Sequence, residues 1–117
     1  MRILLKLSGE VLGGSKGLGL DADTLTHFAK LIGKIAENHE VAIVTGGGNI
    51  MRGKVAKGLD RSKADQIGMM ATVVNCMALE QHLLANGVSA RAVSSVPSLA
   101  DHYDIPAARR LLSEKTM

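Results

Sequence analysis

The 117 residues carry 46% hydrophobic side chains and a net charge of +3, which is enough for one small domain with an aliphatic core and excludes global disorder. Aromatic side chains are limited to one Phe and one Tyr, and no apolar run reaches the roughly 18 residues of a membrane span, so single-stranded nucleic acid and membranes are not expected partners. The single cysteine excludes an intrachain disulfide and fits a cytoplasmic protein.

A strand, a helix and a second strand are predicted in the first half of the chain. Apolar residues dominate the first strand, over 2–8, and four glycines over 13–19 then predict a flexible loop. Asp21 is a candidate N-cap for a helix over 22–37, whose apolar residues recur at helical spacing. Residues 41–45 form the second strand. Both strands are expected to be buried and parallel, in a right-handed βαβ unit.

A long helix over residues 62–85 dominates the second half of the chain. Its apolar side chains lie on two sides, and a helix that is apolar all round has to be covered twice. We expect a partner subunit to supply the second cover. The other predicted elements are, in chain order, a short helix at 50–52, a charged connection over 53–60, a third strand over 89–94, a turn at Pro97 and an amphipathic helix over 106–115.

Glycine-rich turns follow the first two predicted strands. The first turn reads Ser8-Gly9, and the second reads Gly46-Gly47-Gly48-Asn49. Ligands of open α/β sheets bind just beyond the carboxyl ends of the strands, where bare backbone can approach phosphate groups closely. A tight strand-to-helix turn is the structural alternative for the three consecutive glycines. We favour the phosphate site because Arg52 follows within one helical turn.

Lys6 and Asp65 are the charged side chains that could carry chemistry. A lysine inside an apolar strand is costly, so Lys6 either neutralises a transferring phosphoryl group or reaches solvent at a sheet edge. Asp65, near the start of the long helix, either compensates the helix dipole or accepts hydrogen bonds from ribose hydroxyls. A Walker A loop is rejected because Ser15-Lys16 follows Gly14 in the wrong order, and the four histidines show no metal-like spacing.

Four segments occur in an order and spacing that resemble one family. They are Lys6-Leu7-Ser8-Gly9-Glu10, the glycine-rich loop that ends at Gly19, residues 46–53 (GGGNIMRG) and residues 65–75 (DQIGMMATVVN). Together they closely resemble the bacterial UMP kinases (uridylate kinases) of the amino acid kinase superfamily. The resemblance implies an α/β fold, a three-layer αβα sandwich with a mostly parallel sheet. It also implies that residues 1–117 are the N-terminal, UMP-binding-side part of an incomplete amino acid kinase domain, without the C-terminal nucleotide-binding half.

The resemblance also implies roles for individual residues. Lys6 would be the catalytic residue, because it would neutralise charge during phosphoryl transfer. The implied ATP contacts are Lys6, Leu7, Ser8, Gly9, Gly48 and Arg52. The implied UMP contacts are Gly47 and Asp65. The implied site of allosteric activation by GTP is the loop formed by Gly14, Ser15, Lys16, Gly17, Leu18 and Gly19. No residue is assigned to a metal.

The activity implied by the resemblance is transfer of the ATP γ-phosphoryl group to UMP, which gives UDP in pyrimidine nucleotide biosynthesis. Mg²⁺ would accompany ATP, and further implications are activation by GTP, inhibition by UTP and a homohexamer. Two alternatives stay open. The chain could be a catalytically inactive, truncated binding or assembly module that dimerises through the long helix. It could also be an enzyme of the same fold with a different acceptor, a carbamate or an amino-acid carboxylate.

Two features depart from the family pattern. Met51 stands where an aromatic or similar residue is common in the family. No segment matches the Thr-Gly-Asn-Pro-Phe-Phe-Thr-Thr type of sequence that grips UMP, and the segments that bind the adenine and ribose of ATP are also missing. We therefore expect activity from the intact family member rather than from these residues alone.

Overall fold

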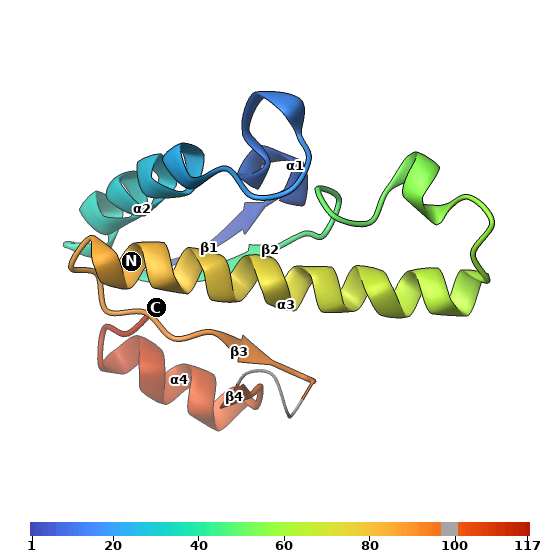
Figure 1. Cartoon of the computed structure of the whole chain (residues 1–117). Coiled ribbons are helices and arrows are strands. Elements are labelled where there is room, and N and C mark those ends of the chain that lie inside the picture. Colours follow the sequence, from blue (N-terminus) through green and yellow to red (C-terminus); the bar gives the residue numbers. More distant parts are fainter. Residues whose placement is uncertain (97–100) are drawn as a thin grey trace.

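The protein is described from a computed structural model, which describes residues 1–96 and 101–117 (Figure 1). Its elements, in chain order, are β1 (Arg2–Leu7), α1 (Gly9–Leu12), the 3₁₀ turn η1 (Gly14–Lys16), α2 (Ala22–Ala36), β2 (Glu40–Thr45), the 3₁₀ turn η2 (Gly53–Ala56), α3 (Arg61–Ala85), β3 (Val93–Ser94), β4 (Asp101–His102) and α4 (Ile105–Ser113).

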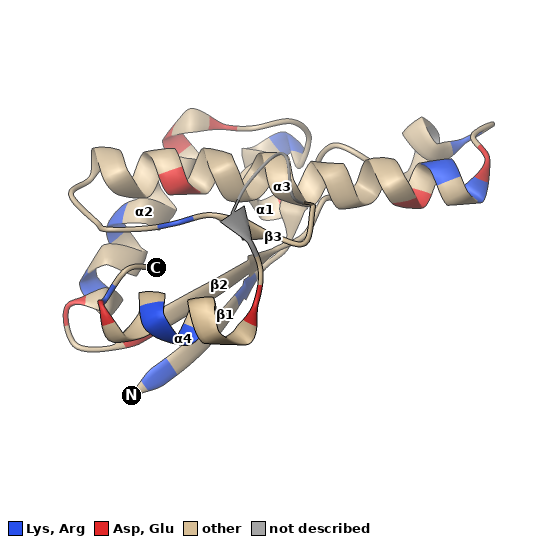
Figure 2. Ribbon diagram, turned by 90° about the horizontal axis from the view of Figure 1, so that it is seen from below, with Lys and Arg blue, Asp and Glu red and all other residues tan. Residues whose placement is uncertain are grey.

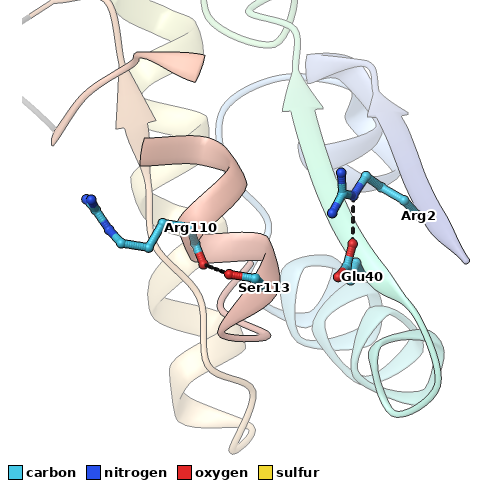
Figure 3. A network of polar contacts seen from close by, with 4 residues as sticks. All are labelled: Arg2, Glu40, Arg110 and Ser113. Atoms are coloured by element: carbon cyan, nitrogen blue, oxygen red, sulfur yellow. Dashed lines mark hydrogen bonds and ion pairs between the residues drawn. The ribbon is translucent and has the colours of Figure 1, made fainter. Parts of the chain in front are cut away.

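The strands β1 and β2 pair in parallel over their whole length. The register runs from Arg2 opposite Glu40 to Leu7 opposite Thr45. At the first of these pairs, the Arg2 Nε atom donates to the Glu40 Oε2 atom over 2.6 Å, between adjacent strands (Figure 3). The predicted parallel arrangement of two strands joined by a helix is therefore confirmed.

The joining helix, α2, begins where its cap predicts. The Asp21 carboxylate accepts a 2.9 Å hydrogen bond from the Thr24 backbone N–H and a 2.6 Å bond from the Thr24 hydroxyl. These bonds favour the ionised carboxylate and lower the pKa of Asp21. The observed bounds, Ala22–Ala36, match the prediction to within one residue.

The core lies between one face of the sheet and the two longest helices. The sheet contributes Leu7, and α2 and α3 bring apolar side chains onto it, so both helices cover the same face. The buried members of this core are Leu7, Leu12, Leu25, Ala29, Ile32, Leu79, Leu83 and Ala90. The core therefore joins residues from near the start of the chain to residues near position 90.

The opposite face of the sheet corrects the prediction that both strands are buried. Leu4 is 71% exposed and Val44 is 47% exposed. Successive side chains of a strand point to opposite faces, and α2 and α3 cover only one of them. Among the described residues, α4 also contacts β2, beside which it lies in Figure 3. A sequence of continuous apolar residues therefore overstates how well this sheet is covered.

The long helix α3 confirms the predicted length and the predicted excess of apolar surface. Asp60 caps it and accepts a 3.2 Å bond from the Lys63 N–H, and Gly87 in the left-handed region follows its end. Residues 66–79 contain no charged side chain, as the uncoloured middle of the helix in Figure 2 shows. The large apolar side chains that this helix leaves exposed are Ile67, Met69, Met70, Val74, Met77 and Leu84.

No helix within residues 1–96 and 101–117 combines the length and the hydropathy needed to cross a membrane.

The predicted third strand over 89–94 is wrong in length. Only Val93–Ser94 is a strand, and it pairs in parallel with β4 instead of joining β1 and β2. The preceding backbone has other partners, since the Ala92 N–H donates to the Glu80 carboxylate over 2.8 Å and the Met117 N–H donates to the Ser89 carbonyl over 3.0 Å. Contacts with α3 and with Met117 therefore replace a longer strand ladder.

Local turn geometry decides the outcome of two other predictions. Residues 50–52 do not begin a helix; the Met51 N–H donates to the Gly47 carbonyl over 3.0 Å and closes a single turn. The predicted helix over 106–115 is observed as Ile105–Ser113, capped by Asp104, with Pro106 in its first turn. The turn predicted at Pro97 lies outside the described residues.

Candidate functional site

The two glycine turns that follow β1 and β2 pack directly against each other. The Gly46 N–H donates to the Leu7 carbonyl over 2.9 Å. A Cβ atom at Gly9 would lie 2.5 Å from the Asn49 Oδ1 atom and 2.6 Å from the Gly48 N atom, so only glycine fits there. The structure thus brings both predicted phosphate-binding segments together at the carboxyl ends of the parallel strands, where open α/β sheets bind ligands.

Gly47 and Gly48 have different surroundings. A Cβ atom at Gly47 would lie 2.8 Å from the Gly68 carbonyl oxygen and 3.0 Å from the Ala71 Cβ atom on α3, so close packing alone requires glycine at this position. At Gly48 the nearest atom is the Glu10 Oε1 atom, at 3.4 Å. Close packing against α3 therefore accounts for Gly47, while Gly48 keeps more room around its backbone.

A reciprocal pair of buried asparagines lies behind the second turn. The Asn49 Nδ2 atom donates to the Asn75 Oδ1 atom over 2.9 Å, and the Asn75 Nδ2 atom donates to the Asn49 Oδ1 atom over 2.7 Å. Neither Asn49 nor Asn75 was assigned a role of its own from the sequence. The available signal was Asn75 itself, a strongly polar side chain in the middle of a helix that is otherwise apolar on two sides.

The charged candidates Lys6 and Arg52 differ in their partners. Lys6 is exposed, and it lies on the open face of the sheet with Leu4, opposite Val44 in the register. Arg52 forms an ion pair with Glu10, and both side chains are about half exposed. Because the pair is open to solvent, it contributes little stability and leaves the Arg52 charge available to an anion.

The predicted loop over 13–19 forms defined turns. η1 is closed by a 3.1 Å bond from the Gly17 N–H to the Gly14 carbonyl, and the loop ends where the Gly19 N–H donates to the Asn49 carbonyl over 2.9 Å. Gly14, Gly17 and Gly19 have φ values of 65°, 64° and 65°, which favour glycine. The end of the loop is thereby tied to the second glycine turn.

Asp65 lines a separate groove of about 480 Å³ beside the glycine turns. It lies in the second turn of α3, as the fifth residue of the helix, and its side chain is exposed. The groove is lined by Met51, Ala56, Ala64, Asp65, Gly68, Met69 and Thr72. Thr45, the last residue of β2, donates from its Oγ1 atom to the Thr72 carbonyl over 3.1 Å, which ties the groove wall to the sheet.

Metal and thiol chemistry have little basis in the described residues. Within 1–96 and 101–117, no three His, Cys, Asp or Glu side chains gather closely enough to hold a metal ion. Cys76, next to Asn75 on α3, is partly buried, and this burial raises the pKa of its thiol. A raised pKa keeps the thiol protonated and weakly reactive.

Comparison with known proteins identifies a family and similar proteins. The family described as "Amino acid kinase family" matches residues 1–117. The chain is 52% identical to a uridylate kinase of Arthrobacter sp. (strain FB24) over 97 residues, which cover 81% of this chain and 39% of that protein. It is 50% identical to a uridylate kinase of Parabacteroides distasonis over 98 residues, which cover 81% of this chain and 42% of that protein.

Solved structures agree with the sequence relatives. A crystal structure of UMP kinase from Ureaplasma parvum matches with a TM-score of 0.91 at 33% identity, over 100% of this chain and 53% of that one. The UMP kinase from Bacillus anthracis matches with a TM-score of 0.88 at 34% identity, over 98% and 50%. The chain thus spans about two fifths to one half of the length of these relatives. The predicted α/β fold, as an incomplete amino acid kinase fold, is confirmed, and the chain belongs to the amino acid kinase family.

Proposed function

We propose that this chain is the N-terminal part of a nucleoside monophosphate kinase that transfers the ATP γ-phosphoryl group to UMP and gives UDP in pyrimidine nucleotide biosynthesis. The observation that carries the proposal is the contact between the two glycine turns at the carboxyl ends of β1 and β2. Relatives named uridylate kinase, at 50–52% identity, support UMP as the acceptor.

In this proposal, residues of both glycine turns bind the ATP phosphates, and the second turn also contacts UMP. Lys6, Leu7, Ser8 and Gly9, with Gly48 and Arg52 from the second turn, bind the ATP phosphates. Lys6 is the catalytic residue because it neutralises charge on the transferring group. Its exposed position at the end of β1 leaves the ammonium group free to meet a phosphate. Backbone N–H groups at the bare glycines donate to phosphate oxygens without a side chain in the way.

The acceptor side of the proposal rests on the groove beside α3. Gly47 and Asp65 would contact UMP, with the Asp65 carboxylate accepting hydrogen bonds from the ribose hydroxyls. The groove volume of about 480 Å³ is within the range of small-molecule pockets.

A cytoplasmic location is also part of the proposal, because the proposed substrates are cytoplasmic nucleotides and the lone cysteine would stay reduced there.

Mg²⁺ enters the proposal with ATP rather than through a protein cage. Within 1–96 and 101–117, no group of three or more His, Cys, Asp or Glu side chains could hold a metal ion. Mg²⁺ in kinases is commonly held by substrate phosphates with few protein ligands, and it neutralises charge on the transferring group. We therefore assign the ion no ligand among these residues.

Regulation and assembly complete the proposal. The loop formed by Gly14, Ser15, Lys16, Gly17, Leu18 and Gly19 is the proposed response element for GTP as an activator, and UTP is the proposed inhibitor. A homo-oligomer, a hexamer by resemblance, is supported by the exposed apolar side of α3. Burial of that surface between copies would remove it from water.

UMP binding to the full chain tests the acceptor site. Titration calorimetry with UMP should give a weaker complex for Asp65→Asn, by about tenfold, because a charge-assisted hydrogen bond is lost. Asp23→Asn, an exposed carboxylate in the first turn of α2, is the matched control and should bind as the unmodified chain does. Equal affinity for the two variants would contradict the role of Asp65.

Phosphoryl transfer is measured as UDP formation from ATP and UMP, with CMP, AMP and GMP as competing acceptors. The proposal expects UMP to be preferred strongly. Turnover of a carboxylate or carbamate acceptor instead would favour the alternative enzyme of the same fold. Absence of UDP formation by the intact, folded protein that contains this chain would contradict the kinase proposal.

A binding or assembly module is the second candidate, and the exposed apolar side of α3 favours it. Sedimentation without nucleotide should then show self-association that Met77→Glu weakens, since a buried charge opposes the contact. Glu80→Gln, on the same helix, serves as a control that adds no charge. A chain that stays monomeric without nucleotide would contradict this second candidate.

A further inference from the structure

The side chains of Asn49 and Asn75 form a buried polar pair behind the second glycine turn. Asn49 is 3% exposed and Asn75 is 0% exposed. Each amide has two donor hydrogens. One hydrogen of each goes to the other asparagine, and the second goes to a backbone carbonyl.

The two carbonyl partners belong to the two segments that the site depends on. The Asn75 Nδ2 atom donates to the Gly46 carbonyl over 2.6 Å, at the start of the second glycine turn. The Asn49 Nδ2 atom donates to the Gly19 carbonyl over 2.6 Å, at the end of the glycine-rich loop. The Gly19 N–H in turn donates to the Asn49 carbonyl, so both polar groups of Gly19 are held by one residue.

The orientation of both amides follows from these partners. If either amide rotated by half a turn, an oxygen would face a backbone carbonyl and a donor would lose its acceptor. An unsatisfied buried donor or acceptor costs roughly 1–3 kcal/mol, so the observed arrangement strongly excludes the rotated one. The pair therefore has one low-energy geometry, and the Asn49 Oδ1 atom is held close to Gly9 in the first turn.

We infer that Asn75 is a positioning residue, which holds the Gly46 end of the second glycine turn directly and the Gly19 end of the loop through Asn49. A displacement of the loop then moves Asn49, and with it the backbone proposed to meet phosphate groups. This inference rests on the proposed function for its link to phosphoryl transfer. The coupling between the loop and the turn does not need a nucleotide.

Amide hydrogen exchange in the nucleotide-free full chain tests the coupling directly. No hydrogen bond of Asn75 reaches the loop, so an effect of Asn75→Ala on the Gly19 N–H has to pass through Asn49. We expect exchange at Gly19 to become about tenfold faster, as expected for the loss of one buried hydrogen-bonded partner. Asn86→Ala is the matched control, because it removes a side-chain bond to the His82 carbonyl at the far end of α3. Equal exchange at Gly19 in both variants would overturn the inference.

A measurement on the unmodified chain keeps the inference testable if Asn75→Ala does not fold. The side-chain NH₂ protons of Asn49 and Asn75 should exchange at least about tenfold more slowly than those of Asn38, which is exposed. Asn75→Asp adds a nearly isosteric variant that replaces the Asn75 donors by acceptors and should accelerate exchange at Gly19 as Asn75→Ala does. Side-chain exchange of Asn49 and Asn75 as fast as that of Asn38 would overturn the buried arrangement.

Phosphoryl transfer by the intact protein that contains this chain supplies the functional readout. Asn75→Asp should lower kcat/KM for ATP by about tenfold while Asn86→Ala leaves it unchanged, because only the first variant disturbs the Gly46 turn. If the unmodified protein transfers no phosphoryl group, the proposed function fails while the exchange measurements still decide the coupling. If transfer is normal in Asn75→Asp, the positioning role fails although the function stands.

Discussion

At the glycine turns, polar groups are buried and each amide hydrogen of Asn49 and Asn75 has a partner, whereas on the outer side of α3 apolar side chains are exposed to solvent. Both regions use the same helix, since Asn75 faces inward and Val74 outward from adjacent positions. The polar groups of the first region find their partners within this chain, whereas the second region leaves apolar surface open to solvent.

The largest expected effect is the difference in stability between alanine substitutions at two adjacent leucines, which lie on different sides of α3. Leu83 is 2% exposed and belongs to the core, while Leu84 is 46% exposed. Leu83→Ala should lower the free energy of unfolding by about 3 kcal/mol, because it removes buried methyl groups and leaves a cavity. Leu84→Ala, the control, should lower it by less than about 1 kcal/mol. Urea denaturation of both variants measures the difference, and similar losses would contradict the division of α3 into two sides.

Smaller effects on the free energy of unfolding, of opposite sign, are expected when two glycines of the site region, Gly9 and Gly68, are replaced by alanine. Gly9→Ala should lower the free energy of unfolding by about 2 kcal/mol, because its Cβ atom would meet the backbone and the Asn49 side chain of the other turn. Gly68→Ala, inside α3 with open space around it, should raise stability by up to about 1 kcal/mol through helix propensity. The same denaturation measurement applies, and a stabilising Gly9→Ala would show that the turns do not pack as described.

The smallest effect concerns the cap of α2 and its dependence on pH. The folded-state pKa of Asp21 is lowered by its hydrogen bonds to Thr24, so the carboxylate stabilises the fold fully above its unfolded pKa, near pH 4. That contribution is lost as the pH falls through the lowered folded pKa. Asp21→Asn keeps a capping side chain and cannot titrate. The melting temperature of the unmodified chain should therefore fall more steeply below about pH 4 than that of Asp21→Asn, and parallel curves would refute the assignment.

Much of the fold was predictable because local signals and tertiary contacts agree. The cap at Asp21 and the helical spacing of apolar residues fix α2, and Gly87 marks the end of α3. The absence of a full strand over 89–94 could not be predicted in the same way. The backbone donors and acceptors of these residues are used by Glu80 and Met117, which no local pattern connects to that segment.

The candidate site divides in a similar way. The meeting of the two glycine turns followed from parallel strands, whose carboxyl ends share one edge. The Asn49–Asn75 pair could not be derived, because a reciprocal bond between positions 26 residues apart depends on how α3 lies across the turn. The pairing of Arg52 with Glu10 was also missed, because it depends on how two distant segments meet in the fold, although both residues lie in segments on which the family resemblance rests.

The composition of the core also sets an order of events during synthesis. Leu7 and Leu12, near the start of the chain, are buried together with Leu79, Leu83 and Ala90. A βαβ unit released from the ribosome before α3 is made has its apolar face open to water, and contacts so distant in sequence form slowly. We therefore expect protease resistance of the nascent N-terminal segment only after residues up to about 90 have left the exit tunnel, when α3 can close over the sheet.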